Sequence, residues 1–187
     1  MTELSLRFDK REIEHWASQY KYSKEALVVD TIAPRMRAAG YLTKPDFLAL
    51  CDWKTSRSKR RCEENSEEFI RAVTQIALST PNEQLRIEVL TLLRGVGWPT
   101  ASVILHFGHS DPYPILDVRA LWSLGVDAST VNYNFDFWRA YTLKCREIAR
   151  ECHVSMRVLD RALWQYSWDN NRRLRRAEHD DKSQYVR

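Results

Sequence analysis

The chain has 187 residues, 44% of them hydrophobic and 29% charged, with a net charge of +4 and a pI near 8.9. This is ordinary globular composition in one domain long enough to bury a core, and it excludes a disordered chain. No apolar run reaches the length of a membrane span, and residues 1–5 lack a signal-peptide pattern, so we expect a cytoplasmic protein. The mild excess of basic residues agrees with a polyanionic partner.

Hydrophobic residues recur at helical spacing through most of the chain. Five glycines and six prolines are too few for the many turns of an all-β fold, and we find no convincing strand. The sequence therefore predicts an all-α fold. The expected helices cover residues 8–20, 23–39, a segment that starts at Thr43 or Asp46, 66–79, 82–93, 99–107, 117–124, 135–152 and 155–176. In the helix at 66–79 we expect the inward residues to be Phe69, Val73, Ile76 and Ala77.

The cysteines and histidines do not indicate a metal site. Four scattered cysteines, in a chain without an export signal, are interpreted as thiols without disulfide bonds. There is no Cys-x-x-Cys pair and no Cys/His cluster, and nothing else in the sequence completes a metal site with His106 and His109. We therefore expect no zinc.

Residues 52–65 are basic, rich in Ser and Thr, and expected to form a loop that exposes Trp53. In one interpretation they are a solvated connection. In the other, Trp53 stacks on a base while cations bind phosphates. The sequence leaves both open. The cations concerned are Lys54, Arg57, Lys59, Arg60 and Arg61.

The helical run at 82–93 stops at a Gly95-Val96-Gly97 turn, and a second run begins at once with Pro99. Proline suits the first turn of a helix, and glycine permits positive φ and close approach of the backbone. A helix, a tight turn and a second helix aim backbone amides outward, which suits a phosphate. Gly-x-Gly turns also merely end helices, so the turn alone is a weak signal.

The residues around and after this turn resemble the signature of a known protein family. Leu93, Gly95, Val96, Gly97, Thr100 and Ala101, with Asp117 downstream in a hydrophobic setting, resemble the signature of the helix-hairpin-helix DNA glycosylase superfamily. The resemblance implies two helical lobes with a cleft between them. One lobe covers residues 25–112 with the hairpin at 93–101, and the other covers residues 1–24 and 113–187.

The resemblance also implies a reaction, hydrolysis of the N-glycosidic bond of a flipped, damaged or modified base in double-stranded DNA by a monomeric enzyme. Asp117 is the implied catalytic carboxylate, although an Asp at this position also suits a helix N-cap. Trp53 and Trp98 are the candidates for the base pocket, together with the large aromatic residues near the C-terminus. The DNA-binding candidates are Arg94, Gly95, Val96, Gly97, Trp98, Thr100, Lys54, Arg57 and Arg119. Core packing for Trp98 and a solvated or carboxylate-neutralising charge for Arg94 and Arg119 are the alternatives.

Two departures from the family pattern limit the expected chemistry. Members that also cleave the strand have a lysine two residues after the second glycine, where this chain has Pro99, which forms no imine. The cysteine loop of the iron–sulfur branch is absent as well. The resemblance therefore implies a monofunctional enzyme that requires no cofactor, with a monovalent cation at the hairpin backbone left open.

Three other functions stay open. The chain can be a non-catalytic helix-hairpin-helix module that binds DNA, because a fold does not guarantee its usual activity. A relocated lysine, such as Lys54 or Lys144, can supply strand cleavage. A helical interaction protein with no nucleic-acid role is the fourth possibility. The sequence does not identify the base, nor whether the activity serves DNA repair or defence against modified viral DNA.

Overall fold

The computed structural model describes residues 4–21 and 25–171. All regular elements in these two ranges are helical, which confirms the all-α prediction for them. Their α-helices are α1 (Ile13–Ser18), α2 (Glu25–Leu27), α3 (Ala33–Ala39), α4 (Lys44–Lys54), α5 (Lys59–Glu63), α6 (Glu67–Ser79), α7 (Glu83–Glu88), α8 (Trp98–Gly108), α9 (Val118–Ser123), α10 (Phe135–Glu151) and α11 (Met156–Asn170). The shorter turns are η1 (Lys10–Glu12), η2 (Val28–Ile32), η3 (Ser56–Ser58), η4 (Val89–Leu92) and η5 (Ala128–Thr130).

The described chain divides into two compact units. Unit 1 is formed by residues 4–21, 117–131 and 144–171, and unit 2 by residues 25–116 and 132–143. Asp117 therefore begins the second segment of unit 1, while the turn at 93–97 belongs to unit 2. None of the described helices is long and apolar enough to cross a membrane.

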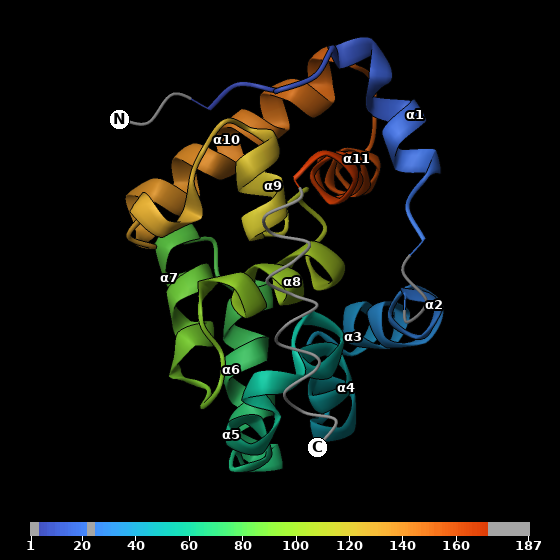
Figure 1. Cartoon of the computed structure of the whole chain (residues 1–187). Coiled ribbons are helices and arrows are strands. Elements are labelled where there is room, and N and C mark those ends of the chain that lie inside the picture. The colour runs from blue at the N-terminus through green and yellow to red at the C-terminus, as the bar shows by residue number, and fades with distance from the viewer. Residues whose placement is uncertain (1–3, 22–24, 172–187) are drawn as a thin grey trace, which may run out of the picture. The chain divides into compact units, whose positions relative to one another are not determined.

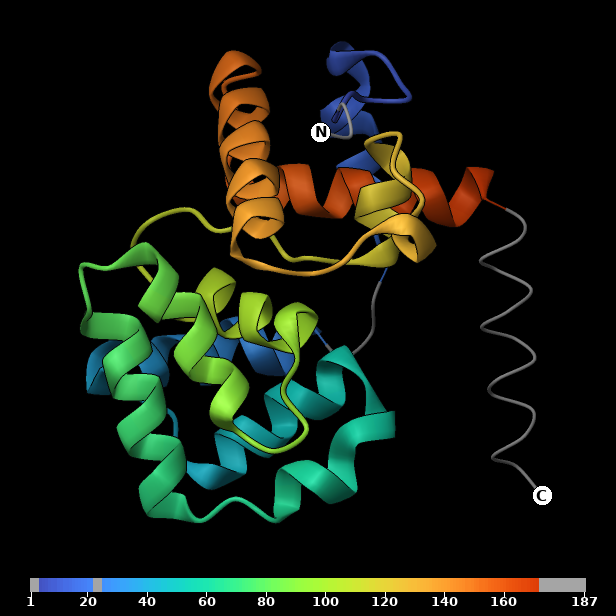
Figure 2. The same ribbon diagram turned by 90° about the vertical axis from the view of Figure 1, so that its left-hand side faces the viewer.

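Unit 2 is built around α8, which packs against α3, α4, α6 and α7 (Figure 2). Most residues of α8 are fully buried, because Ala101, Val103, Ile104 and Leu105 place methyl groups on every side of the helix. Burying such an all-round apolar helix is a large part of the stability of the unit.

The expected helix at 23–39 contains a π-helical turn at η2. Pro34 has no backbone N–H to donate, and the amide of Ala33 bonds to the carbonyl oxygen of Val28, five residues back. The helix ends as predicted at Gly40, which has a positive φ of 75°. Its expected first residue, Ser23, lies outside the described residues.

Unit 1 is organised by α11, which packs against α1 and α9 (Figure 1). Its buried residues include Ile13 of α1, Leu121 of α9, and Leu159 and Leu163 of α11. The N-terminal segment joins this packing through backbone bonds, among them Ser5 N to Leu124 O at 3.0 Å. The expected continuation of α11 to residue 176 lies outside the described residues.

Two expectations from the sequence are wrong. Residues 52–65 do not form a loop, since they contain the end of α4, η3 and α5, and Trp53 is only 7% exposed, with its ring against Phe107. In α6 the buried stripe is Ile70, Val73, Thr74 and Ala77. Phe69 and Ile76 are more than 40% exposed, because a helix buries residues at i, i+3, i+4 and i+7, and Ile70 starts that series.

Candidate nucleic-acid interface and catalytic carboxylate

The turn between η4 and α8 is a four-residue β-turn closed by a bond from Val96 N to Leu93 O, 3.0 Å. Gly95, at its third position, has a φ of 83°. A side chain there would also collide with α5, because an added Cβ would lie 2.6 Å from the Sγ of Cys62 and 3.1 Å from the backbone oxygen of Ser58. Gly95 is therefore required twice, for its positive φ and for its close approach to α5. Val96 is buried.

Asn65 fixes this turn from the side. Its amide oxygen accepts from the backbone N–H of Arg94, and its amide nitrogen donates to the backbone oxygen of Arg94, both at 2.9 Å. The same nitrogen donates to the backbone oxygen of Cys62. The Arg94 side chain lies on the surface, where it pairs with Glu64 at 2.8 Å. Sequence reasoning missed Asn65, because nothing in its neighbourhood indicates a partner 29 residues away.

Gly97 differs from Gly95 in that it faces open space. It is the N-cap of α8, with an extended backbone, and the nearest atom to an added Cβ is the Pro99 Cδ at 3.8 Å. Gly97 has no side chain to cap the helix, and Pro99 occupies the first turn. The amides of a helix's first turn have no intrahelical acceptor, and they carry the positive end of the helix dipole.

Trp98 is half-buried, with its ring centroid 6.5 Å from that of Trp138, whereas Thr100 is buried.

Exposed cations lie on the element beneath Gly95. The Thr55 hydroxyl caps η3 by accepting from Arg57 N, and α5 follows directly. Arg57 is exposed, and Lys54 is half-buried at the end of α4. The remaining exposed cations of this element are Lys59, Arg60 and Arg61. Because Ser58 and Cys62 contact the Gly95 position, the element that carries these cations packs against the turn.

The segment that leads to Asp117 is hydrogen-bonded to α8. Leu116 N donates to the Ser102 hydroxyl at 2.8 Å, and that hydroxyl donates to Pro99 O. His106 Nδ1 donates to Tyr113 O at 2.7 Å. The Tyr141 hydroxyl of α10 donates to the carbonyl oxygen of Ile115, also at 2.7 Å, and Ile115 lies between Tyr113 and Leu116. The backbone is thus held up to the residue that precedes Asp117.

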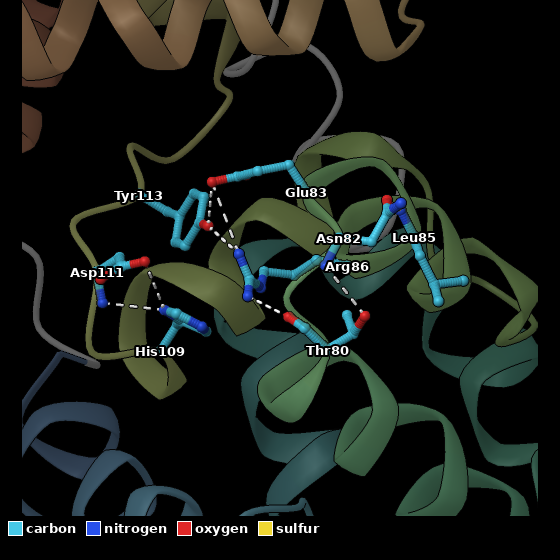
Figure 3. Close-up of polar contacts among 8 residues, drawn as sticks. All are labelled: Thr80, Asn82, Glu83, Leu85, Arg86, His109, Asp111 and Tyr113. Carbon is cyan, nitrogen blue, oxygen red and sulfur yellow. Dashed lines mark hydrogen bonds and ion pairs between the residues drawn. The ribbon is translucent and has the colours of Figure 1, made fainter.

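Tyr113 anchors the start of this segment to α7 (Figure 3). Its hydroxyl accepts from Arg86 Nη1 at 2.6 Å and donates to Glu83 at 2.9 Å, while Arg86 also donates to the Thr80 backbone oxygen. Arg86 is buried, and the carboxylate of Glu83, 3.6 Å away, offsets part of the cost of burying its guanidinium. The Tyr113 ring stacks on Trp138 at 5.6 Å. This network orders the connection between α8 and α9.

Asp117 is the N-cap of α9, as its sequence context allows. Its Oδ1 accepts from Arg119 N at 2.9 Å, and the residue is half-buried. A carboxylate in this role caps the helix and interacts favourably with the positive end of its dipole. Asp117 thus lies, half-buried, at the point where unit 1 resumes.

Arg119 does not occupy the exposed position expected of a DNA contact. It is 1% exposed, and its guanidinium carbon lies 4.7 Å from the ring centroid of Trp168 and 5.4 Å from that of Trp164. The two indoles stack on each other, with centroids 5.1 Å apart and planes 10° apart. Trp164 and Trp168 are four residues apart in the sequence, a spacing that places two side chains on the same face of a helix. Core packing accounts for such a spacing equally well, so the sequence alone did not indicate the stack.

Cys51 and Cys62 form a buried, hydrogen-bonded thiol pair beside the turn. The hydrogen bond that the Cys51 thiol donates lowers the pKa of Cys62, burial opposes this effect, and the Ser58 hydroxyl, as a donor to the thiolate, lowers the pKa further, to about 7. The pKa of Cys51 is raised, since it donates to Cys62 and is buried. Cys62, which lies next to Gly95, is thus the thiol of the pair that loses its proton first.

The two lysines considered for strand cleavage belong to different units. Lys144 pairs with Glu147 at 3.0 Å in unit 1, whereas Lys54 ends α4 in unit 2. Among residues 4–21 and 25–171, no group of three or more His, Cys, Asp or Glu side chains could hold a metal ion.

Comparisons with protein-family models, with curated proteins and with solved structures find no match for this chain.

Proposed function

We propose that the chain is a monofunctional DNA glycosylase, which hydrolyses the bond between an extruded base and its deoxyribose. The observation that carries the proposal is the construction of the turn at 93–97. Two buried supports, Asn65 and Cys62, hold it against α5, and it ends at a helix N-terminus that Gly97 leaves sterically open. A backbone held in this way binds a phosphate with amides and positions DNA without reading its sequence.

Cations beside the turn extend this phosphate-binding surface. Arg57 and the basic residues of α5 are exposed, and Arg94 is engaged only in a surface ion pair, which it can exchange for a phosphate at little cost. The buried side chains of Thr100 and Arg119 do not belong to the proposed contact set. The proposed set is therefore the backbone of residues 95–98, Arg94, Arg57 and the cations of α5.

Asp117 supplies the chemistry in this proposal. Cleavage of an N-glycosidic bond passes through an oxocarbenium-like sugar, whose positive charge a carboxylate stabilises while it orients the attacking water. Asp117 is half-buried, so it is partly shielded from solvent. With Pro99 in place of a lysine after the turn, no imine forms there, and the product is an abasic site.

The test is base release from duplex DNA. Panels of duplexes that carry alkylated, deaminated, oxidised, mismatched or virally modified bases are incubated with wild type and with Asp117→Asn, then treated with alkali. We expect breaks only after alkali, from one class of base, and none with Asp117→Asn. Breaks before alkali, or a protein–DNA adduct trapped with borohydride, would contradict the monofunctional reaction.

A non-catalytic DNA-binding module is the second candidate. It is favoured by the N-cap bond of Asp117, which explains this residue without any catalysis. In that case wild type binds duplex DNA in a salt-sensitive manner, Asp117→Asn binds equally well or better, and no duplex yields an abasic site.

A further inference from the structure

The residues that lead into Asp117 are held by side chains of unit 2. Ile115 and Leu116 are buried, and the backbone of each is hydrogen-bonded to a side chain. A planar peptide bond joins Leu116 to Asp117, so a contact that fixes the Leu116 backbone also limits where the chain can place Asp117. The role of these residues in the reaction rests on the proposed function, in which Asp117 is the catalytic carboxylate.

Ser102 fixes the Leu116 backbone to α8. Its hydroxyl accepts from Leu116 N at 2.8 Å and donates to Pro99 O at 2.7 Å, and the side chain is fully buried. Pro99 lies in the first turn of α8, the helix whose N-terminus is the proposed phosphate site. A hydroxyl has one proton to donate, and Ser102 uses it on Pro99 while a lone pair serves Leu116. The two bonds together therefore tie Leu116 to the first turn of α8.

Asp117 is also held on its other side. Its Oδ1 accepts from Arg119 N at 2.9 Å, as the N-cap of α9. The Tyr141 hydroxyl adds a further bond before Asp117, to the carbonyl oxygen of Ile115 at 2.7 Å. A carboxylate that acts on a reacting sugar must be placed accurately, because a misplacement of about 1 Å can slow a reaction about a hundredfold. The bonds on both sides of Asp117 restrict the carboxylate in the way that such accuracy requires.

Unit 2 contains the same arrangement of hydrogen bonds at a second place. The Thr74 hydroxyl of α6 accepts from Leu42 N at 2.9 Å and donates to Ile70 O at 2.7 Å, and Thr74 is also fully buried. Like Ser102, Thr74 ties a connecting segment to a helix, since Leu42 lies between α3 and α4. None of these three residues belongs to the proposed phosphate contacts or adjoins Asp117. The Thr74 hydroxyl therefore measures what such bonds contribute to stability alone.

We propose that Ser102 is a positioning residue for base release, because its hydroxyl fixes the backbone next to Asp117 to the first turn of the phosphate-binding helix. The chain then enters the catalytic residue from a defined point on α8. Ser102 is buried and does not touch DNA, so it acts only through Leu116. Loss of the hydroxyl slows the reaction of bound DNA and leaves DNA affinity unchanged, because the proposed phosphate contacts are backbone amides and exposed cations.

The test separates the rate of base release from DNA affinity. Single-turnover rates are measured at saturating enzyme on the duplex from which wild type releases a base. Affinity is measured by fluorescence anisotropy on a duplex that carries a tetrahydrofuran abasic analogue. Ser102→Ala removes the hydroxyl, whereas Ser102→Thr keeps one. Thr74→Val is the matched control, because it removes a hydroxyl that makes the corresponding two bonds.

We expect Ser102→Ala to slow base release about tenfold to a hundredfold, with affinity for the tetrahydrofuran duplex within about twofold of wild type. Thr74→Val should lower the melting temperature by a similar amount, since each change leaves a buried backbone N–H without its acceptor. The rate of folded Thr74→Val should nevertheless stay within about twofold of wild type. A rate loss in Ser102→Ala no larger than that in Thr74→Val, or an equal loss of affinity and rate, would overturn the proposal.

Two further variants cover the case in which Ser102→Ala does not fold. Threonine in a helix can direct its hydroxyl to the carbonyl oxygen three or four residues back, so Ser102→Thr should retain most of the wild-type rate. Tyr141→Phe removes the bond to Ile115 O and keeps the ring, and it should slow base release about threefold or more without a change in affinity. A folded Tyr141→Phe with the wild-type rate would contradict positioning through this segment.

Hydrogen exchange at Leu116 reports directly on the bond to Ser102. We expect slow exchange of the Leu116 amide in wild type and in Ser102→Thr, and exchange at least about tenfold faster in Ser102→Ala, at a temperature where all three proteins are folded. Unchanged protection of Leu116 in a Ser102→Ala protein that has lost base release would show that the rate loss has another cause, and it would overturn the positioning role.

The outcomes separate the two proposals. If wild type releases a base and folded Ser102→Ala releases it as fast as Thr74→Val does, the glycosylase proposal stands and the positioning role of Ser102 is wrong. If wild type releases no base from any duplex, the proposed function fails, and the positioning role fails with it.

Discussion

The side-chain amide of Asn65 is hydrogen-bonded to both polar atoms of the Arg94 backbone, at 2.9 Å each. The turn that begins the proposed phosphate site is therefore held by its backbone, whereas the Arg94 side chain remains at the surface in an ion pair with Glu64. A phosphate can recruit Arg94 without any loss of support for the turn.

Asn65→Ala should destabilise the protein and loosen the turn. The change removes three hydrogen bonds and leaves the backbone groups of Arg94 and Cys62 without this partner, so we expect a loss of about 2–4 kcal/mol in the free energy of unfolding. Urea denaturation measures it. Arg94→Ala serves as the control, because an exposed ion pair contributes only about 0–1 kcal/mol. Similar losses in both variants would contradict the bracing role of Asn65.

The two glycines of the turn should respond oppositely to alanine. Gly95→Ala places a methyl group 2.6 Å from the Sγ of Cys62 at a positive φ, and we expect about 2–4 kcal/mol of destabilisation. Gly97→Ala meets nothing closer than 3.8 Å, so its stability should change by less than about 1 kcal/mol. Its methyl group lies where a phosphate would approach, and DNA affinity should fall. Unchanged DNA binding in a folded Gly97→Ala would argue against this N-terminus as the phosphate site.

Asp117 can be tested for its two roles separately. Asparagine caps helices about as well as aspartate does, so Asp117→Asn should keep the melting temperature and lose base release by about two orders of magnitude or more. Asp117→Ala should lose base release and also about 1 kcal/mol of stability, because the cap is removed. Single-turnover rates and thermal melts distinguish the two effects. Substantial base release by Asp117→Asn would remove Asp117 from the reaction.

The thiol pair predicts a specific pH dependence of stability. The pKa of Cys62 is depressed to about 7 in the folded state, so its contribution is present above the unfolded pKa near 9 and is lost as pH falls through 7. The pKa of Cys51 is raised, so its contribution is present below about 9 and declines at higher pH. Stability should thus rise from pH 7 to about 9 and decline above it. Cys62→Ser should flatten the rise, as urea midpoints across this range would show, whereas Cys152→Ser should leave it unchanged.

The basic residues near the turn predict the salt dependence of DNA binding. Removing one phosphate contact lowers the slope of log affinity against log salt by about one. We therefore expect the double variant Arg57→Gln, Lys59→Gln to lower the slope by about two. Arg71→Gln should leave the slope unchanged, because the guanidinium of Arg71, on α6, lies over the ring of Tyr41. Fluorescence anisotropy across a salt series measures the slopes. Equal slopes for all three proteins would place the DNA elsewhere.

Much of the helical structure was predictable, because the signals are local. Four helices are capped by a side chain that accepts a hydrogen bond from the amide three residues on; the caps are Thr43, Ser66, Asn82 and Ser155. Gly40 and Gly125 adopt the positive φ that glycine permits at helix ends. The turn at 95–97 and the N-cap position of Asp117 follow from equally short-range patterns.

Other features required the tertiary structure. Amphipathic spacing did not settle which stripe of α6 is buried, since Ile70 and Thr74 compete with Phe69 and Ile76 for the same core. Trp53 looks exposed in a basic sequence, but the core of unit 2 receives its ring. In each case the deciding contact is made by residues far away in the chain.

The sequence by itself determined that the chain is helical, where a glycine turn meets a helix N-terminus, and that a carboxylate follows 20 residues later. Those features depend on backbone preferences and on side chains that bond within a few residues. Only the tertiary structure decided that Asn65 and Cys62 support the turn, that Arg119 is buried, and that two indoles of α11 lie over it. These contacts join residues about 30 to 50 positions apart in the chain. Which residues meet depends on how the helices pack, and the sequence within a few residues of each position does not specify that packing.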